Sequence, residues 1–102
     1  MPKKAMETLT ESMFYLLMVL GDSPLCGTDA AAAIKSRSHG RISMGPATLY
    51  TLLSRFLEKK YIREIAGEKG RRTYEITVEG RAAYAAELRR LRQCIDDAGG
   101  KL

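Results

Sequence analysis

The spacing of apolar residues changes twice along this chain, and that change limits the folds it can adopt. Up to about residue 58, large apolar side chains recur at intervals of three and four, the period of an α-helix. From Tyr61 to Thr77, apolar and polar residues alternate instead, as they do in a β-strand. After Thr77 the helical interval returns. The sequence therefore predicts a β-hairpin enclosed between helices.

The first helix is predicted to begin near Thr8 or Thr10. Thr8 and Glu11 fit a capping box, in which each side chain accepts a hydrogen bond from the other residue's backbone N–H. The sequence Gly-Asp-Ser-Pro at 21–24 stops the helix and turns the chain. One helical face carries the apolar residues Leu9, Met13, Leu16, Leu17 and Leu20. We expect this face to pack in the core.

Two further helices should follow. One is predicted from about Thr28, a suitable N-cap, to Ser36. The next should open at Gly45-Pro46, because proline at the first helical position loses no hydrogen bond. Its apolar stripe consists of Leu49, Leu52, Leu53 and Phe56, with Leu57 at the edge. The remaining surface of this third helix is polar or carries small side chains, which leaves it free for recognition.

The hairpin and the last helix complete the pattern. Strands are predicted at 61–66 and 71–77, joined by the turn Gly-Glu-Lys-Gly at 67–70. Thr77 is a good N-cap for a final helix that runs to about Asp96. This helix carries a narrow apolar seam of Tyr84, Leu88, Leu91 and Ile95. A chain this short offers little surface to cover the seam, so we expect it to pack against a second copy of the chain.

Three helices followed by a two-stranded ribbon are the architecture of a winged helix-turn-helix. The expected fold class is mainly α with a small β-hairpin (α+β). It combines three helices, a two-stranded wing and a C-terminal dimerisation helix. Residues 1–80 would form the winged-helix DNA-binding domain and residues 81–102 the dimerisation helix, both within one structural unit.

Composition favours a nucleic-acid partner over catalysis. The chain has 17 Lys and Arg against 12 Asp and Glu, a formal net charge of +5, and a pI of about 9.4. Such a basic domain attracts polyanions, nucleic acid before anionic membranes. The only histidine is His39, and the sequence contains no Walker-type loop, no metal-ligand cluster and no motif pairing a nucleophile with a base. We therefore expect no enzyme activity, no cofactor and no metal.

The start of the chain resembles a signal peptide only superficially. Lys3 and Lys4 precede the apolar run 13–20, but Glu7 and Glu11 interrupt the approach. The run is also shorter than the roughly 20 residues that a membrane span needs. Cys26 and Cys94 form no CxxC pair and are expected to be reduced thiols. These features indicate a cytoplasmic protein without a membrane partner.

Several motifs resemble the PadR family of transcriptional regulators. Residues 45–50 read Gly-Pro-Ala-Thr-Leu-Tyr, similar to the family pattern GPxTLY in the recognition helix. Residues 70–80 are similar to the family's wing and its exit, and 9–17 to its first helix. The resemblance extends from Leu9 to about Leu91. It departs at Gly27-Thr28, where the family often has Gly-Tyr, and at Phe56, where leucine is more usual.

The resemblance implies a dimeric repressor of the family's short form, which binds a palindromic operator in double-stranded DNA. The residues expected to contact DNA are Ala47, Thr48, Tyr50, Thr51 and Arg55 on the third helix and Lys69, Arg71 and Arg72 on the wing. Tyr50 lies about 100° from the apolar stripe, so its phenol can reach a phosphate, although a core-edge position is the alternative. Arg55 could instead pair with Glu58, and the wing cations could be a solvated turn.

The resemblance also implies a response to small molecules, such as phenolic compounds or drugs. Phe14, Tyr15 and Met18 of the first helix are core residues by default, but in a dimer they could line a pocket for an aromatic effector. A second function stays open at this point, because a winged-helix fold can bind protein rather than DNA. The basic wing beside a small polar helix face favours DNA.

Overall fold

The helices begin at residues that cap them or set their first turn. In the computed structural model, which describes residues 8–99, α1 spans Glu11–Asp22. Its N-cap is Thr10, whose hydroxyl accepts a hydrogen bond from the Met13 N–H at 3.2 Å. Of the two expected starts the helix therefore uses Thr10, and Thr8 precedes it. Lys3 and Lys4 lie outside the described residues.

The second helix begins slightly earlier than the sequence pattern predicts. α2 spans Gly27–Arg37 with Cys26 as its N-cap, so the expectation of Thr28 as the cap is wrong. Cys26 already belongs to a short strand, β1 (Leu25–Cys26), whose extended backbone leads directly into the helix. The Thr28 hydroxyl lies within the first turn of α2, 3.4 Å from the Cys26 sulfur.

The predicted start of the third helix at Gly45-Pro46 is confirmed. α3 spans Pro46–Glu58, with Gly45 as N-cap and proline in its first turn. It buries Leu49, Leu53 and Phe56. Leu52 and Leu57 pack partly buried beside this stripe, and the opposite face of α3 stays at the surface.

The wing is part of a three-stranded antiparallel sheet. β2 (Ile62–Ala66) pairs with β3 (Arg72–Ile76) in a register that sets Glu64 opposite Tyr74. β1 pairs with the other edge of β3, which gives the order β1-β3-β2. The expected two-stranded ribbon is thus correct, and a third strand joins it along β3, where Leu25 and Cys26 face Tyr74 and Thr73. The wing turn is the short 3₁₀ segment Glu68–Gly70, with Lys69 and Gly70 at positive φ.

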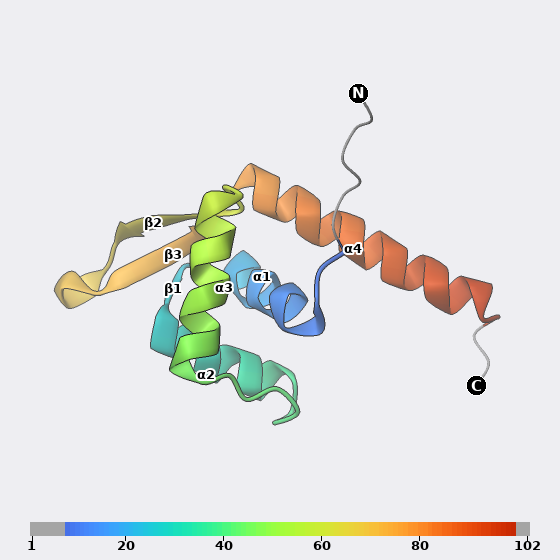
Figure 1. Cartoon of the computed structure of the whole chain (residues 1–102), viewed down its shortest axis with the longest axis horizontal. Coiled ribbons are helices and arrows are strands. Elements are labelled where there is room, and N and C mark those ends of the chain that lie inside the picture. The colour runs from blue at the N-terminus through green and yellow to red at the C-terminus, as the bar shows by residue number, and fades with distance from the viewer. Residues whose placement is uncertain (1–7, 100–102) are drawn as a thin grey trace.

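The core forms around α1 (Figure 1), against which α2, α4 and β3 pack. Its largest fully buried apolar side chains come from three helices: Leu16, Leu17, Leu20, Ile34, Leu53 and Phe56. Apolar contact among these side chains fixes the mutual orientation of the first three helices.

The last helix is anchored at the junction between α3 and β2. α4 spans Val78–Asp97, and its N-cap Thr77 accepts a hydrogen bond from the Gly80 N–H at 3.0 Å. The same hydroxyl donates to the Lys60 carbonyl at 2.6 Å. The Tyr84 ring then stacks on Phe14 of α1, with ring centroids 4.8 Å apart. The C-terminal part of α4 projects from the body of the molecule (Figure 1).

A buried carboxylate ties α4 to the start of α1. Glu87 is only 6% exposed and forms an ion pair with Arg90. Hydrogen bonds from Arg90 and from the Leu9 backbone hold the pKa of the Glu87 carboxyl below its usual value. A depressed pKa means that the carboxylate stabilises the fold at neutral pH, and that this contribution is lost as the pH falls through the folded-state pKa.

Alanine substitutions at two helical glycines should change the stability of the fold in opposite directions. A Cβ at Gly80 would collide with the Tyr61 carbonyl oxygen, whereas a Cβ at Gly21 meets only the end of Arg81, at 4.0 Å. Gly80→Ala should lower the free energy of unfolding by about 1–3 kcal/mol through overpacking. Gly21→Ala, the matched control, should raise it by up to about 1 kcal/mol. Urea unfolding measures both, and an unchanged stability of Gly80→Ala would contradict the close approach of α4 to Tyr61.

Candidate nucleic-acid interface

The exposed face of α3 carries small and polar side chains. A shallow groove of about 500 Å³ runs along it, lined by Ala47, Tyr50, Thr51, Ser54, Arg55 and Glu58. The Thr51 hydroxyl donates to the Ala47 carbonyl at 2.9 Å, which fixes its rotamer and turns its acceptor side outward. Thr48 is exposed in the first turn. Among the ion pairs within residues 8–99, none is formed between Arg55 and Glu58. The alternative that Glu58 holds the Arg55 guanidinium is therefore not observed.

Tyr50 lies on the flank of α3, as its helical position predicts. The residue is 47% exposed, so it is not a core aromatic. Its hydroxyl lies over the first turn of α2, where a Cβ added at Gly27 would come within 2.6 Å of the oxygen. Gly27 therefore makes room for the phenol. The close approach places the Tyr50 hydroxyl beside the N-terminal turn of α2.

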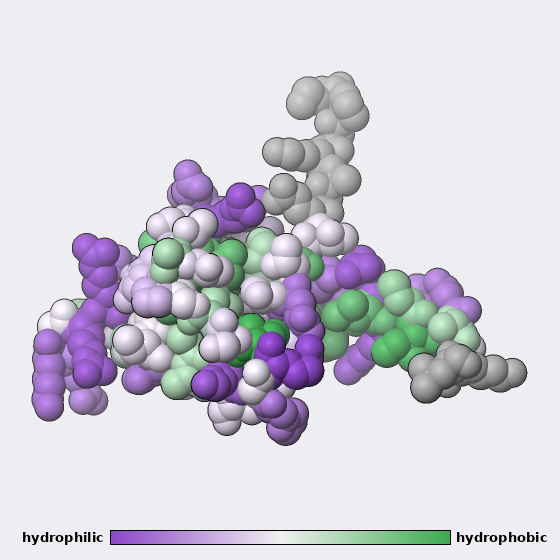
Figure 2. Space-filling view, turned by 60° about the horizontal axis from the view of Figure 1, so that its bottom comes forward, coloured by the Kyte–Doolittle hydropathy of each residue, from purple (hydrophilic) through white to green (hydrophobic). Residues whose placement is uncertain are grey.

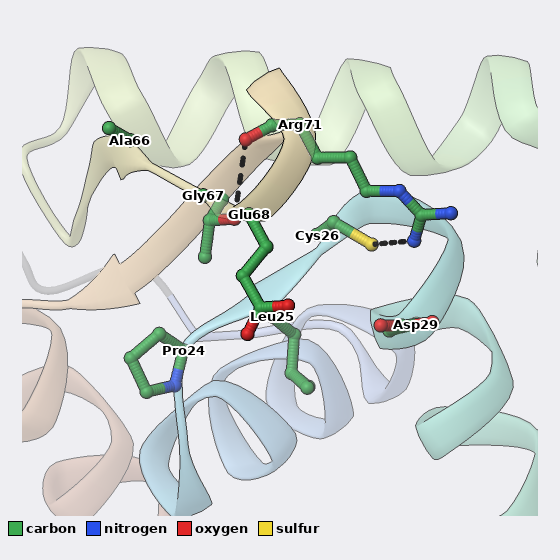
Figure 3. A pocket seen from close by; sticks show the side chains of 9 residues that line it. Pro24, Leu25, Cys26, Asp29, Ala66, Gly67, Glu68 and Arg71 are labelled. Atoms are coloured by element: carbon green, nitrogen blue, oxygen red, sulfur yellow. Dashed lines mark hydrogen bonds between the residues drawn. The ribbon is translucent and has the colours of Figure 1, made fainter.

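The wing cations take up three different positions. Lys69 lies in the exposed turn, and Arg72 pairs with Glu64 of β2 at 3.6 Å. Arg71 instead extends back over β1, where a guanidinium nitrogen lies 3.8 Å from the Cys26 sulfur (Figure 3). The expected group of Lys69, Arg71 and Arg72 at one tip is thus dispersed along the wing, and Arg71 faces α2.

Arg71 borders a hollow between the wing and α2. The hollow has a volume of about 380 Å³, and Figure 3 shows the Arg71 side chain reaching over it to the Cys26 sulfur. A hydrogen bond from the Thr28 hydroxyl, together with one from the Asp29 backbone, lowers the pKa of the Cys26 thiol. Cys26 and Cys94 are both free thiols, the first buried and the second exposed. Arg71 and Tyr50 thus approach the start of α2 from the wing and from α3.

The apolar seam of α4 is covered along only part of its length. Tyr84, Leu88 and Leu91 pack partly buried against the core, whereas Ile95 is 61% exposed. Figure 2 shows hydrophobic surface on the projecting part of α4, at the opposite end of the molecule from the hydrophilic wing. The chain therefore presents a polar and an apolar surface at separate ends.

The three residues predicted to line an effector pocket do not share one cavity. Phe14 and Tyr15 line a pocket of about 410 Å³ between α1 and α4. Met18 lines a different one, of about 310 Å³, nearer the end of α1. The Tyr15 hydroxyl also accepts a hydrogen bond from Arg41 at 3.2 Å. Nothing in the periodicity of the sequence indicated this arginine, because its contact spans 26 residues.

Two other classes of site are absent from the described part of the chain. Across residues 8–99, no group of three or more His, Cys, Asp or Glu side chains is arranged to hold a metal ion. In the same range, no helix combines the length and the apolar character needed to cross a membrane.

The helices and the small antiparallel sheet define a winged helix-turn-helix protein in which one face of α3 stays exposed. The sequence matches the model of the transcriptional regulator PadR-like family over residues 16–86. The chain belongs to this family, whose members are transcriptional regulators and not enzymes. The resemblance seen in the motifs is thereby confirmed. No curated protein sequence matches the chain significantly.

Solved structures of other regulators share the fold. A transcriptional regulator from Clostridium thermocellum aligns with 88% of this chain and 91% of its own, at a TM-score of 0.75 and 23% identity. A probable transcriptional regulator from Pseudomonas aeruginosa aligns with 92% of this chain and 67% of its own (TM-score 0.73, 23% identity). MepR, a regulator of the Staphylococcus aureus multidrug efflux pump MepA, aligns with 92% and 66% (TM-score 0.71, 20% identity). At these identities the likeness shows the winged-helix fold.

The contact between Tyr50 and Gly27 can be tested without DNA. Gly27→Ala should displace the Tyr50 hydroxyl, because the new Cβ would lie 2.6 Å from it. The free energy of unfolding should change by about 1 kcal/mol or less, since the atom that must move is the end of a side chain. NMR contacts between the Tyr50 ring and residue 27 measure the displacement. Gly45→Ala, with nothing within 4 Å of its Cβ, is the control, and unshifted Tyr50 ring signals in Gly27→Ala would contradict the placement.

Proposed function

We propose that the protein represses transcription by binding a palindromic operator in double-stranded DNA as a homodimer, and that a small aromatic effector releases it. The observation that carries the proposal is the exposed, small polar face of α3, flanked by Tyr50 and the wing cations. Ala47, Thr48 and Thr51 lie towards the N-terminal part of this helix. That part of a recognition helix meets base edges in a major groove about 12 Å wide.

Phosphate contacts would position α3 in the groove. The Tyr50 hydroxyl and the first turn of α2 lie together, so one phosphate could accept hydrogen bonds from both. Arg71 can reach the same backbone from the wing side, where it borders the hollow beside α2. Lys69 and Arg72 would contact phosphates further along the DNA backbone, although Glu64 partly neutralises the charge of Arg72. These contacts supply affinity and register, while Thr48, Thr51 and Arg55 would supply sequence preference.

The homodimer would form through α4. Tyr84, Leu88, Leu91 and Ile95 would meet the first helix of the other copy, which would cover the surface that the chain itself leaves open. A two-fold axis through this interface would set two α3 helices on half-sites roughly 34 Å apart. In this proposal residues 1–80 form the DNA-binding part and 81–102 the dimerisation helix.

An effector would bind near this interface. Beside its charged side chains, the pocket between α1 and α4 combines the Phe14 and Tyr15 rings with Leu9 and Leu91, a lining suited to a flat aromatic molecule with a polar group. Since Phe14 stacks on Tyr84, a ring inserted there would disturb the packing of α4 on α1. Met18 would contribute only after rearrangement, because it lines the neighbouring pocket.

Charge contacts and base contacts should respond differently to salt. Arg71→Ala should weaken binding to operator and scrambled duplexes by similar factors, and it should flatten the slope of log affinity against log salt by about 0.9. Thr48→Glu should abolish operator binding, because a carboxylate would face the groove. Fluorescence anisotropy over a salt series measures both effects, and circular dichroism shows that the fold is retained. Arg37→Ala, an exposed arginine on the far end of α2, is the matched control.

The outcome also decides between DNA and protein as the partner. If the wild-type protein selects no sequence from random DNA, the proposal of a specific operator is wrong. A protein-binding module would then be the better interpretation. An Arg71→Ala variant with an unchanged salt slope but an altered sequence preference would place Arg71 in a groove rather than on a phosphate.

The exposed end of the α4 seam allows a clean test of dimerisation. Ile95→Asp should shift the protein from dimer to monomer at micromolar concentration, because it buries a charge at an apolar interface at a cost of several kcal/mol. Ile95 is 61% exposed in the single chain, so the fold of each subunit should survive. Light scattering measures the mass. Gln93→Asp places the same acid on the opposite face of α4 and should remain dimeric, and a wild-type monomer would contradict the proposal.

A further inference from the structure

We propose that Arg41 couples the pocket between α1 and α4 to the recognition helix α3. Arg41 lies in the connection between α2 and α3 (residues 38–45), yet its side chain contacts α1. The inference rests on the proposed function, in which α3 reads DNA and the pocket takes the effector. It adds the contacts through which a ligand in the pocket would change how firmly α3 is held.

The connection is held in the core by one buried hydroxyl. Ser38 is 1% exposed, and its hydroxyl donates to the Lys35 carbonyl at 3.3 Å. The same oxygen accepts a hydrogen bond from the Ile42 N–H at 3.0 Å, and the Ile42 side chain is buried. The backbone on either side of Arg41 is thus fixed at Ser38 and Ile42. Arg41 lies between these two anchors, so its contacts with α1 add to what holds the segment that leads into Pro46.

The guanidinium of Arg41 contacts two residues of α1. One nitrogen lies 3.0 Å from a Glu11 carboxylate oxygen, and another donates to the Tyr15 hydroxyl at 3.2 Å. The guanidinium carbon also lies 6.0 Å from the centre of the Tyr15 ring. Glu11 and Tyr15 are on the same helical face, four residues apart, so one planar side chain can bind both.

The same two residues form a wall of the pocket. Glu11 and Tyr15 line the 410 Å³ cavity together with Phe14, and α4 closes its other side with Leu91. A ligand that donates a hydrogen bond to the Tyr15 hydroxyl or pairs with the Glu11 carboxylate would compete with Arg41. Binding in the pocket would then release the guanidinium and loosen the connection. This direction agrees with an effector that weakens DNA binding.

The contact can be measured through the amide of Ile42. Arg41→Gln removes the charge, and Tyr15→Phe removes the hydroxyl while keeping the ring that lines the pocket. Each should speed hydrogen exchange of the Ile42 N–H by about two- to fivefold, the range expected when a solvent-exposed pair is lost. The double variant should exchange no faster than Arg41→Gln alone, because that change already removes the contact with the Tyr15 hydroxyl. Arg37→Gln breaks an exposed pair with Asp22 and should leave Ile42 unchanged.

Operator affinity is the second readout. Arg41→Gln, which loses both contacts, should lower it at least as much as Tyr15→Phe, again without a further loss in the double variant. Unchanged Ile42 exchange in Arg41→Gln, or single effects that multiply in the double variant, would overturn the coupling. A failure of the proposed function looks different: the wild type would then select no operator, while the exchange rates would still report whether Arg41 links α1 to the connection.

Discussion

The burial of one narrow stripe on α3 fixes the orientation of the helix on which the proposed DNA interface depends. Leu49, Leu53 and Phe56 are each at most 2% exposed, and burial of such side chains contributes about 1.5–3 kcal/mol apiece. Because the stripe is narrow, the helix cannot rotate without exposing it. The opposite face is thereby held at the surface, with its threonines, Ser54 and Arg55 outward. A DNA-reading helix needs this combination of a fixed axis and a free face.

The elements that follow α3 depend on the same anchor. Tyr61 packs its ring near Phe56, with centroids 5.7 Å apart, and its carbonyl accepts a hydrogen bond from the Thr77 N–H. Thr77 in turn caps α4 and bonds to Lys60. The wing and the projecting helix therefore both start from one small junction behind α3. This arrangement sends the polar wing and the apolar seam of α4 to opposite ends of the molecule.

Local signals in the sequence predicted most of the fold. Gly45-Pro46 marks the start of α3, and Thr77 marks the start of α4, because capping depends on neighbouring residues alone. The sequence analysis did not predict β1, because a strand of two residues shows no alternation of its own and forms only through its pairing with β3. The cap of α2 moved to Cys26 for the same reason. The positions of Arg71 and Arg41 depend on partners 45 and 26 residues away, and periodicity carries no information at that range.

The central claim is that this chain reads a DNA sequence with α3. The most direct measurement is the affinity of the purified wild-type protein for a palindrome selected from random DNA, against a scrambled duplex of equal length, at physiological salt. We expect the selected duplex to bind at least about 10³-fold more tightly, the lower bound typical of specific regulators. Equal affinity for the two duplexes, with both falling alike as salt rises, would show backbone attraction alone and would contradict base reading by α3.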